Sequence, residues 1–137
     1  MVDTLILREF FRDPLGIAAV TSSSVAMATQ LSAAIPESGE PVVVELGAGT
    51  GACTGVIQRR LNGRGRHIAV EVNPIFAQLL AKHYPHVDVV CGEAKDLPKF
   101  LADRSAPAAE VIISTLPWAP FAPHQHSSRC WRPWSSP

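Results

Sequence analysis

The stretch Val42-Val-Val-Glu-Leu-Gly-Ala-Gly-Thr-Gly51 decides how this chain folds. It opens with consecutive β-branched residues, which are typical of a buried strand, and glycine then occupies positions 47, 49 and 51. Glycine adopts backbone angles that other residues avoid and lets the backbone approach a ligand closely. Because residues 52–61 have the pattern of a helix, we expect strand, glycine turn and helix to form a cradle of the kind that binds nucleotides.

The alternation of strand and helix continues after this stretch. Asn73-Pro74 has the form of a helix cap followed by proline at the first helical position. The further predicted elements are a strand at 66–71, a helix at about 74–83, a strand at 87–91, a short helix at roughly 97–103 and a strand at 110–114. Strands that alternate with helices form parallel sheets. The predicted fold class is therefore α/β, a Rossmann-like doubly wound parallel sheet of about four strands, preceded by two helices.

Two segments of different character flank this core. Residues 3–11 and 25–35 show helical spacing of apolar residues before it, whereas the chain after Trp118 is rich in proline and serine and shows no periodicity. We expect the sheet to be incomplete and the tail to be non-native, because doubly wound sheets usually continue past a fourth strand. An ordered coil that covers the sheet edge is the alternative. The predicted segments are N-terminal helices at 1–40, a cofactor-binding core at 41–118 and an irregular tail at 119–137.

The composition excludes several classes of protein. Twelve basic and twelve acidic residues leave no net charge, so no overall field attracts nucleic acid or acidic lipid. The chain has neither the pattern of a signal peptide nor an apolar run of about 18 residues, and we expect a cytoplasmic protein. Its three cysteines and five histidines match no metal-ligand spacing, so we expect no metal.

The positions of acidic residues favour a ligand that contains adenosine. Glu71 ends the second predicted strand about 20 residues after the glycine turn, where a carboxylate binds ribose hydroxyls. Glu93 and Ala94 follow the third strand, where an adenine edge would be read, and Glu45 could position the amino-acid end of S-adenosylmethionine through the loop backbone or a water. All of them lie at the carboxyl ends of parallel strands, the side on which open sheets bind ligands.

A nicotinamide dinucleotide is the competing cofactor. Residues 47–52 also satisfy the dinucleotide fingerprint that ends in glycine or alanine, with Glu71 as its ribose acid. Pyrophosphate binding, however, does not require the negative charge of Glu45, nor the Leu-Pro-Trp turn at 116–118 after the fourth strand. We therefore expect S-adenosylmethionine.

Four motifs carry a resemblance to a known family: Val-Glu-Leu-Gly-Ala-Gly-Thr-Gly (44–51), Ala-Val-Glu-Val-Asn-Pro (69–74), Cys-Gly-Glu-Ala (91–94) and Ile-Ile-Ser-Thr-Leu-Pro-Trp (112–118). In order and spacing they resemble the motifs of class I S-adenosylmethionine-dependent methyltransferases, over about residues 10–121. Within that superfamily the chain most resembles bacterial phospholipid N-methyltransferases, which are similar to ribosomal RNA adenine dimethyltransferases. Thr115 stands where the RNA enzymes have asparagine, which weakens the RNA alternative.

The resemblance implies methyl transfer from S-adenosylmethionine to an amine nitrogen, first of a phospholipid head group and second of an rRNA adenine. It implies a lipid or small-molecule substrate rather than nucleic acid. Contact of the N-terminal helix with the inner face of the membrane is an open alternative, as is a remnant that binds the cofactor without turnover. The implied cofactor-binding residues are Glu45, Gly47, Ala48, Gly49, Gly51, Glu71, Val72, Glu93 and Ala94. The implied catalytic turn comprises Ser114, Thr115, Leu116, Pro117 and Trp118, although Trp118 is equally well explained as a core residue.

Overall fold

The computed structural model describes residues 22–116 of the 137-residue chain. The helix predicted at 3–11, the tail at 119–137, and Pro117 and Trp118 of the predicted catalytic turn lie outside the described residues. Within the described range, no helix has the length and apolarity that crossing a membrane requires.

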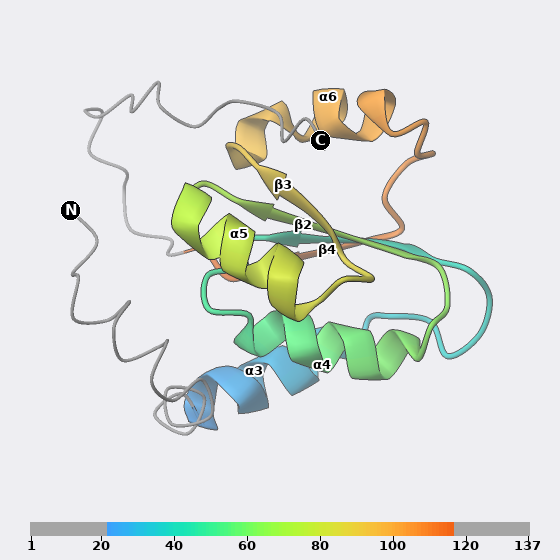
Figure 1. Ribbon diagram of the computed structural model, residues 1–137. Helices are drawn as coiled ribbons and strands as arrows, with labels where there is room; N and C mark the ends of the chain where they lie inside the picture. The colour runs from blue at the N-terminus through green and yellow to red at the C-terminus, as the bar shows by residue number, and fades with distance from the viewer. Residues whose placement is uncertain (1–21, 117–137) are drawn as a thin grey trace.

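A parallel sheet of four strands forms the centre of the described region (Figure 1). Its strands are β1 (Val42–Leu46), β2 (Arg66–Glu71), β3 (Asp88–Cys91) and β4 (Val111–Ser114). They lie in the order β3-β2-β1-β4, so the chain moves outward from β1 through β2 to β3 and then returns to the other side of β1. The strand order therefore reverses between β1 and β4, and open α/β sheets bind ligands at such a switch point.

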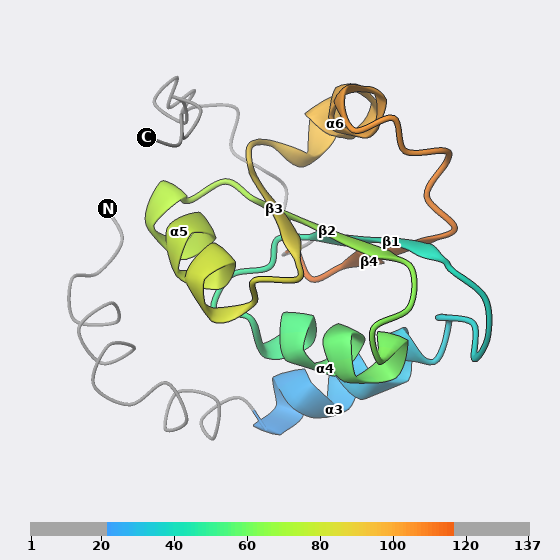
Figure 2. The ribbon, with the colours of Figure 1, turned by 45° about the vertical axis from the view of Figure 1, so that its right-hand side comes forward.

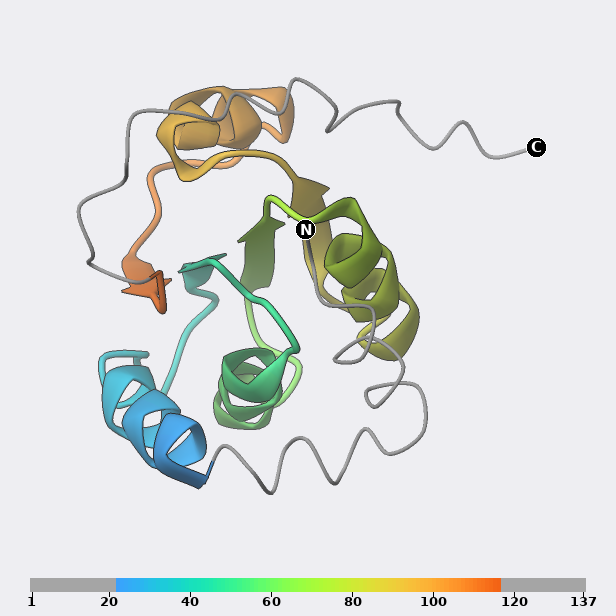
Figure 3. The same ribbon diagram turned by 90° about the vertical axis from the view of Figure 1, so that its left-hand side faces the viewer.

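Helices cover both faces of this sheet, as Figures 2 and 3 show. One face carries α3 (Ser22–Ser32), α4 (Ala52–Leu61) and α5 (Pro74–His83). The other face carries α6 (Leu97–Asp103), which follows the short 3-10 helix η1 (Ala94–Asp96). The predicted α/β doubly wound fold is confirmed.

Alternation along the strands produces two separate apolar cores. Val43 in β1 and Ile113 in β4 pack with Ile57 of α4 on one face. Val44, the next residue of β1, belongs to the opposite core, against which Phe100 of α6 packs. Because successive side chains of a strand point to opposite faces, each residue of β1 is assigned to one of these cores by its position alone.

The helix ends follow from local hydrogen bonding. The Asn73 side chain accepts hydrogen bonds from the amides of Ile75 and Phe76, which confirms the predicted cap of α5. Helix α3 ends at Ser32, earlier than the predicted Ile35, and tighter turn bonds such as that from the Ile35 amide to the Ser32 carbonyl follow it. Strands β3 and β4 each begin one residue later than predicted.

Candidate functional site

The turn between β1 and α4 depends on glycine at three positions. Gly47, Gly49 and Gly51 all have positive φ angles, of 76°, 54° and 89°. The Gly47 amide donates to the Val70 carbonyl of β2 at 2.9 Å, and the Gly51 amide donates to the Ala48 carbonyl at 3.0 Å. Since side chains disfavour this left-handed region, the sequence could not form this turn with other residues at low cost.

The three glycines differ in what surrounds them. A Cβ atom on Gly47 would lie 2.5 Å from Cδ2 of Leu116, and one on Gly51 would lie 3.0 Å from the ring of Tyr84. A Cβ on Gly49 would meet only the carbonyl of Gly47, at 3.9 Å. Two of the glycines therefore accommodate side chains of the protein, whereas the backbone of Gly49 faces space that no side chain of residues 22–116 occupies. Contact of the three glycines with a ligand remains a prediction.

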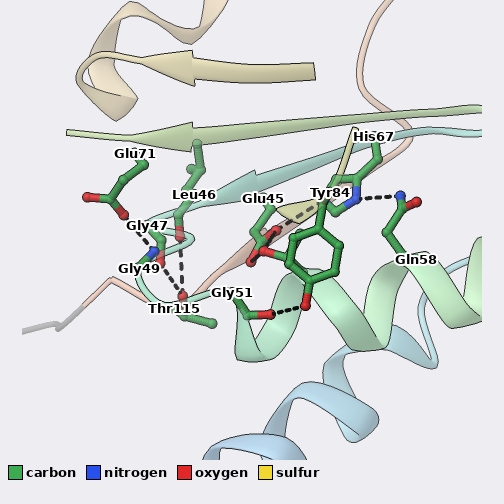
Figure 4. A network of polar contacts seen from close by, with 11 residues as sticks. Glu45, Leu46, Gly47, Gly49, Gly51, Gln58, His67, Glu71, Tyr84 and Thr115 are labelled. Atoms are coloured by element: carbon green, nitrogen blue, oxygen red, sulfur yellow. Dashed lines mark hydrogen bonds and ion pairs between the residues drawn. The ribbon is translucent and has the colours of Figure 1, made fainter. Parts of the chain in front are cut away.

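Glu71, the last residue of β2, contacts the glycine turn. Its carboxylate accepts hydrogen bonds from the backbone amides of Gly49 at 2.6 Å and Asn73 at 2.9 Å, and the residue is 6% exposed (Figure 4). Each carboxylate oxygen retains lone pairs for a further donor. The predicted ribose-binding acid therefore lies against the open glycine of the turn.

Glu45 does not point into this turn. Its carboxylate is fully buried and accepts a hydrogen bond from the Thr54 hydroxyl at 2.9 Å. The same carboxylate lies 3.0 Å from Nε2 of His67 (Figure 4). The other ring nitrogen of His67, Nδ1, lies 2.9 Å from the side-chain nitrogen Nε2 of Gln58. The prediction that Glu45 positions a cofactor through the loop backbone or a water remains a prediction. Strand alternation turns its side chain to the face that α4 covers, where it holds α4 to the sheet.

The network around Glu45 was missed by the sequence reasoning. Thr54 and Gln58 are four residues apart in α4 and so lie on one side of that helix. That spacing was the available signal, but only the sheet register, which pairs Val43 with His67, brings the imidazole to the same face.

The turn after β4 lies directly against the glycine turn. The Thr115 amide donates to the Leu46 carbonyl at 3.1 Å, and the Thr115 hydroxyl donates to the Gly47 carbonyl at 2.8 Å (Figure 4). The Ser114 hydroxyl oxygen accepts from the Leu116 amide at 3.4 Å. The structure therefore brings the described part of the predicted catalytic turn to the predicted cofactor turn.

The other predicted cofactor residues lie near the same edge with different surroundings. Ala48 is buried and packs with Ala69 of β2, so its side chain faces the core. Val72, directly after Glu71, is half exposed, Glu93 forms an ion pair with Lys95 at 2.8 Å, and Ala94 begins η1. Contacts between a cofactor and Val72, Glu93 or Ala94 remain predictions.

Two titratable groups next to the glycine turn stay protonated at neutral pH. Burial, together with the nearby Glu45 carboxylate, raises the pKa of the Cys53 thiol to about 12. Burial also raises the pKa of Tyr84, with Arg59 acting in the opposite direction, and its hydroxyl donates to the Gly51 carbonyl at 3.3 Å. Neither group is a ready base or nucleophile.

A switch point between β1 and β4, a glycine turn and a carboxylate from β2 that binds this turn together define a Rossmann-like domain. An ornithine lipid N-methyltransferase of Singulisphaera acidiphila is 38% identical to the chain over 120 residues, which are 85% of the chain and 62% of that relative. This relative supports the resemblance inferred from the motifs. The chain spans less than two thirds of the length of this relative.

Two solved structures also align with the chain. The plantazolicin methyltransferase BamL, solved with a desmethylPZN analog and SAH, has a TM-score of 0.47 and 15% identity over 71% of this chain and 35% of its own. The plantazolicin methyltransferase BpumL has a TM-score of 0.45 and 13% identity over 66% of this chain and 39% of its own. No protein-family model matches the chain.

Proposed function

We propose that this chain is the cofactor-binding part of an S-adenosylmethionine-dependent methyltransferase that acts on an amine nitrogen of a lipid head group. The observation that carries the proposal is the 38% identity, over 85% of the chain, to an ornithine lipid N-methyltransferase. An ornithine side chain and a phospholipid amine offer the same chemistry, a nitrogen lone pair that attacks a methyl carbon.

The residues at the turn fit the cofactor. Gly49 leaves open space beside its backbone, and the buried Glu71 carboxylate next to it keeps lone pairs that can accept two ribose hydroxyls. Val72 adds an exposed apolar side chain immediately after Glu71, suited to the flat face of adenine. When bound, S-adenosylmethionine would supply an electrophilic methyl group on a sulfonium.

The protein's contribution to such a reaction is placement of the amine. Oxygen atoms of Ser114 and Thr115 lie at the end of β4, next to the glycine turn, and can accept N–H groups of a neutral amine. Well-oriented intramolecular reactions gain on the order of 7 to 11 kcal/mol from such placement. No covalent intermediate with the protein is needed, which agrees with the protonated state of Cys53 and Tyr84.

The geometry disfavours a dinucleotide. Helix-start glycine turns bind pyrophosphate through free backbone amides, whereas the Gly49 amide is donated to the Glu71 carboxylate at 2.6 Å. A pyrophosphate would have to displace this carboxylate and lie close to its charge. An RNA substrate is disfavoured by the absence of net positive charge.

Equilibrium binding of radiolabelled S-adenosylmethionine to the full chain tests the proposal. We expect binding by the wild type, at least tenfold weaker binding by Glu71→Ala, and unchanged binding by Glu37→Ala, which removes a carboxylate whose side chain is 85% exposed. Thermal unfolding of each variant separates loss of binding from loss of fold. Methyl transfer is then compared on vesicles that contain an amine lipid and on rRNA.

Each outcome has a distinct meaning. Absence of binding by the folded wild type would overturn the proposed cofactor. Binding without transfer to either acceptor would identify a domain that holds the cofactor without turnover, and transfer to rRNA alone would replace the lipid as substrate.

A further inference from the structure

The glycine turn is held from three directions. Glu71 of β2 binds the Gly49 amide, and Tyr84, which ends α5, packs against Gly51 and donates to its carbonyl. The third contact is the hydrogen bond that the Thr115 hydroxyl donates to the Gly47 carbonyl. Thr115 follows β4, on the opposite side of the switch point. This contact joins the cofactor turn to the segment expected to receive the amine.

This third contact is made by a side chain just beyond the paired residues of β1 and β4. The β1–β4 register ends where Leu46 pairs with Ser114, and the Thr115 amide adds one more bond to the Leu46 carbonyl. The Leu116 amide donates to the Ser114 hydroxyl oxygen at 3.4 Å. The carbonyl of Gly47 is taken by the Thr115 hydroxyl at 2.8 Å.

Packing reinforces the same junction. A Cβ atom on Gly47 would lie 2.5 Å from Cδ2 and 3.0 Å from Cγ of Leu116, so the leucine side chain occupies the space that the glycine leaves. Two neighbouring residues therefore hold Gly47 in place: Thr115 through its hydroxyl and Leu116 through its apolar side chain. A movement of either turn would break both contacts.

We propose that Thr115 is a positioning residue whose hydroxyl couples the turn after β4 to the glycine turn, so that amine and cofactor are held in one relative placement. The inference rests on the proposed function. The hydroxyl has a single hydrogen, and donating it to Gly47 leaves Thr115 Oγ1 with acceptor capacity only. This is the polarity that the N–H of a neutral amine requires.

Two substitutions in the full chain separate the hydroxyl from the rest of the side chain. Thr115→Val keeps the shape and removes the donor, and Thr115→Ser keeps the donor. Hydrogen exchange of the amides at 47–51 without ligand reports on the turn itself. The affinity for S-adenosylmethionine and the separate kcat and KM for an amine lipid report on the coupling.

We expect Thr115→Val to accelerate exchange at 47–51 and to weaken S-adenosylmethionine binding roughly five- to tenfold, the effect of one lost hydrogen bond. We expect its kcat to fall by a larger factor than its affinity for the lipid, because placement rather than lipid binding is impaired. In Thr115→Ser, the exchange rates at 47–51, the affinity for S-adenosylmethionine and kcat should all lie within about twofold of the wild-type values.

Wild-type exchange and affinity in Thr115→Val would overturn the inference and leave the proposed function standing. Equal losses in Thr115→Ser and Thr115→Val would also overturn it, because the hydroxyl would then not be the coupling group. If the wild type binds no S-adenosylmethionine, the proposed function fails instead, and the coupling to a cofactor fails with it, while the exchange data still decide whether Thr115 holds the turn.

Discussion

The Glu71 carboxylate lies 2.6 Å from the backbone nitrogen of Gly49, so the acid that ends β2 and the open glycine of the first turn form one hydrogen-bonded unit. The same carboxylate also accepts from the Asn73 amide, at the start of α5. It is thereby fixed in place before any ligand arrives, and a preformed acceptor does not lose side-chain entropy on binding.

Replacing this carboxylate by its amide should cost stability as well as affinity. In Glu71→Gln the side-chain NH2 group faces one of two backbone amides that are themselves donors, so one of them loses its acceptor. We expect the free energy of unfolding to fall by about 1 to 3 kcal/mol, measured by urea denaturation. Glu37→Gln, in which an exposed carboxylate is changed in the same way, should be neutral. Equal stability of the two variants would contradict this reading of the Glu71 contacts.

Truncation of Glu45 should be more damaging than truncation of a surface acid. Thr54 and His67 are both buried and would lose their shared partner, and a buried polar group left without a hydrogen-bond partner costs about 1 to 3 kcal/mol. We expect this loss in urea denaturation of Glu45→Ala and a smaller one in Glu45→Gln, which keeps the volume and an acceptor. If Glu45→Ala were no less stable than Glu37→Ala, the network would not fasten α4 to the sheet.

The cost of a side chain at Gly51 can be separated from the cost of its backbone angle. Gly39 has a similar φ, 83° against 89°, but an added Cβ would meet nothing within 4 Å, whereas on Gly51 it would lie 3.0 Å from Leu80 and Tyr84. Gly39→Ala should cost about 1 to 2 kcal/mol, from backbone strain alone. Gly51→Ala should cost about 1 to 3 kcal/mol more, from overpacking. Thermal and urea unfolding of both variants measure the difference, and equal costs would show that the helix packing yields easily.

Alkaline pH should destabilise the protein through Cys53. The folded state holds the thiol proton up to a pKa of about 12, whereas the ordinary pKa of the group is 9.0, so the folded state binds more protons between these pH values. The stabilisation is complete below pH 9 and is lost as the pH rises toward 12. Between pH 9 and 10 the free energy of unfolding should fall by about 1 kcal/mol from this group.

The control for this pH dependence is Cys53→Ala, which should lose that part of the decrease. Tyr84 should keep contributing in the same direction in the variant, since burial raises its pKa as well. The measurement is urea denaturation at a series of pH values. Identical alkaline profiles for the variant and the wild type would contradict the assigned pKa of Cys53.

The order of elements in the core was predictable from the sequence because each has a local cause. Residues 52–61 and 74–83 are helices within the predicted bounds, and Asn73 caps the second of them as its sequence indicates. The strand at 66–71 also has the predicted bounds. The differences from the predicted bounds fall at helix and strand ends, as at Ser32, where turn bonds follow the helix.

Side-chain partners distant in sequence were not predictable in the same way. Glu45 and Glu71 are both acids at strand ends beside the same turn, yet one faces α4 and the other faces Gly49. The register pairs Glu45 with Ala69, so both acids lie on the same face of the sheet. Glu71 lies one residue beyond the last residue of β2 that pairs with β1, at the level of the glycine turn, and this register is not fixed by the pattern of residue types. The surroundings of the glycines depend in turn on Tyr84 and Leu116, far away in the chain.

The unequal surroundings of the three glycines affect how far such a motif can serve as a signature. Positions 47 and 51 are constrained by the packing of Leu116 and Tyr84, whether or not anything occupies the site. A descendant that no longer used the site would keep both glycines, because the fold requires them. Substitutions at Gly49 and Glu71 would therefore be the first sign that a cofactor site had been lost.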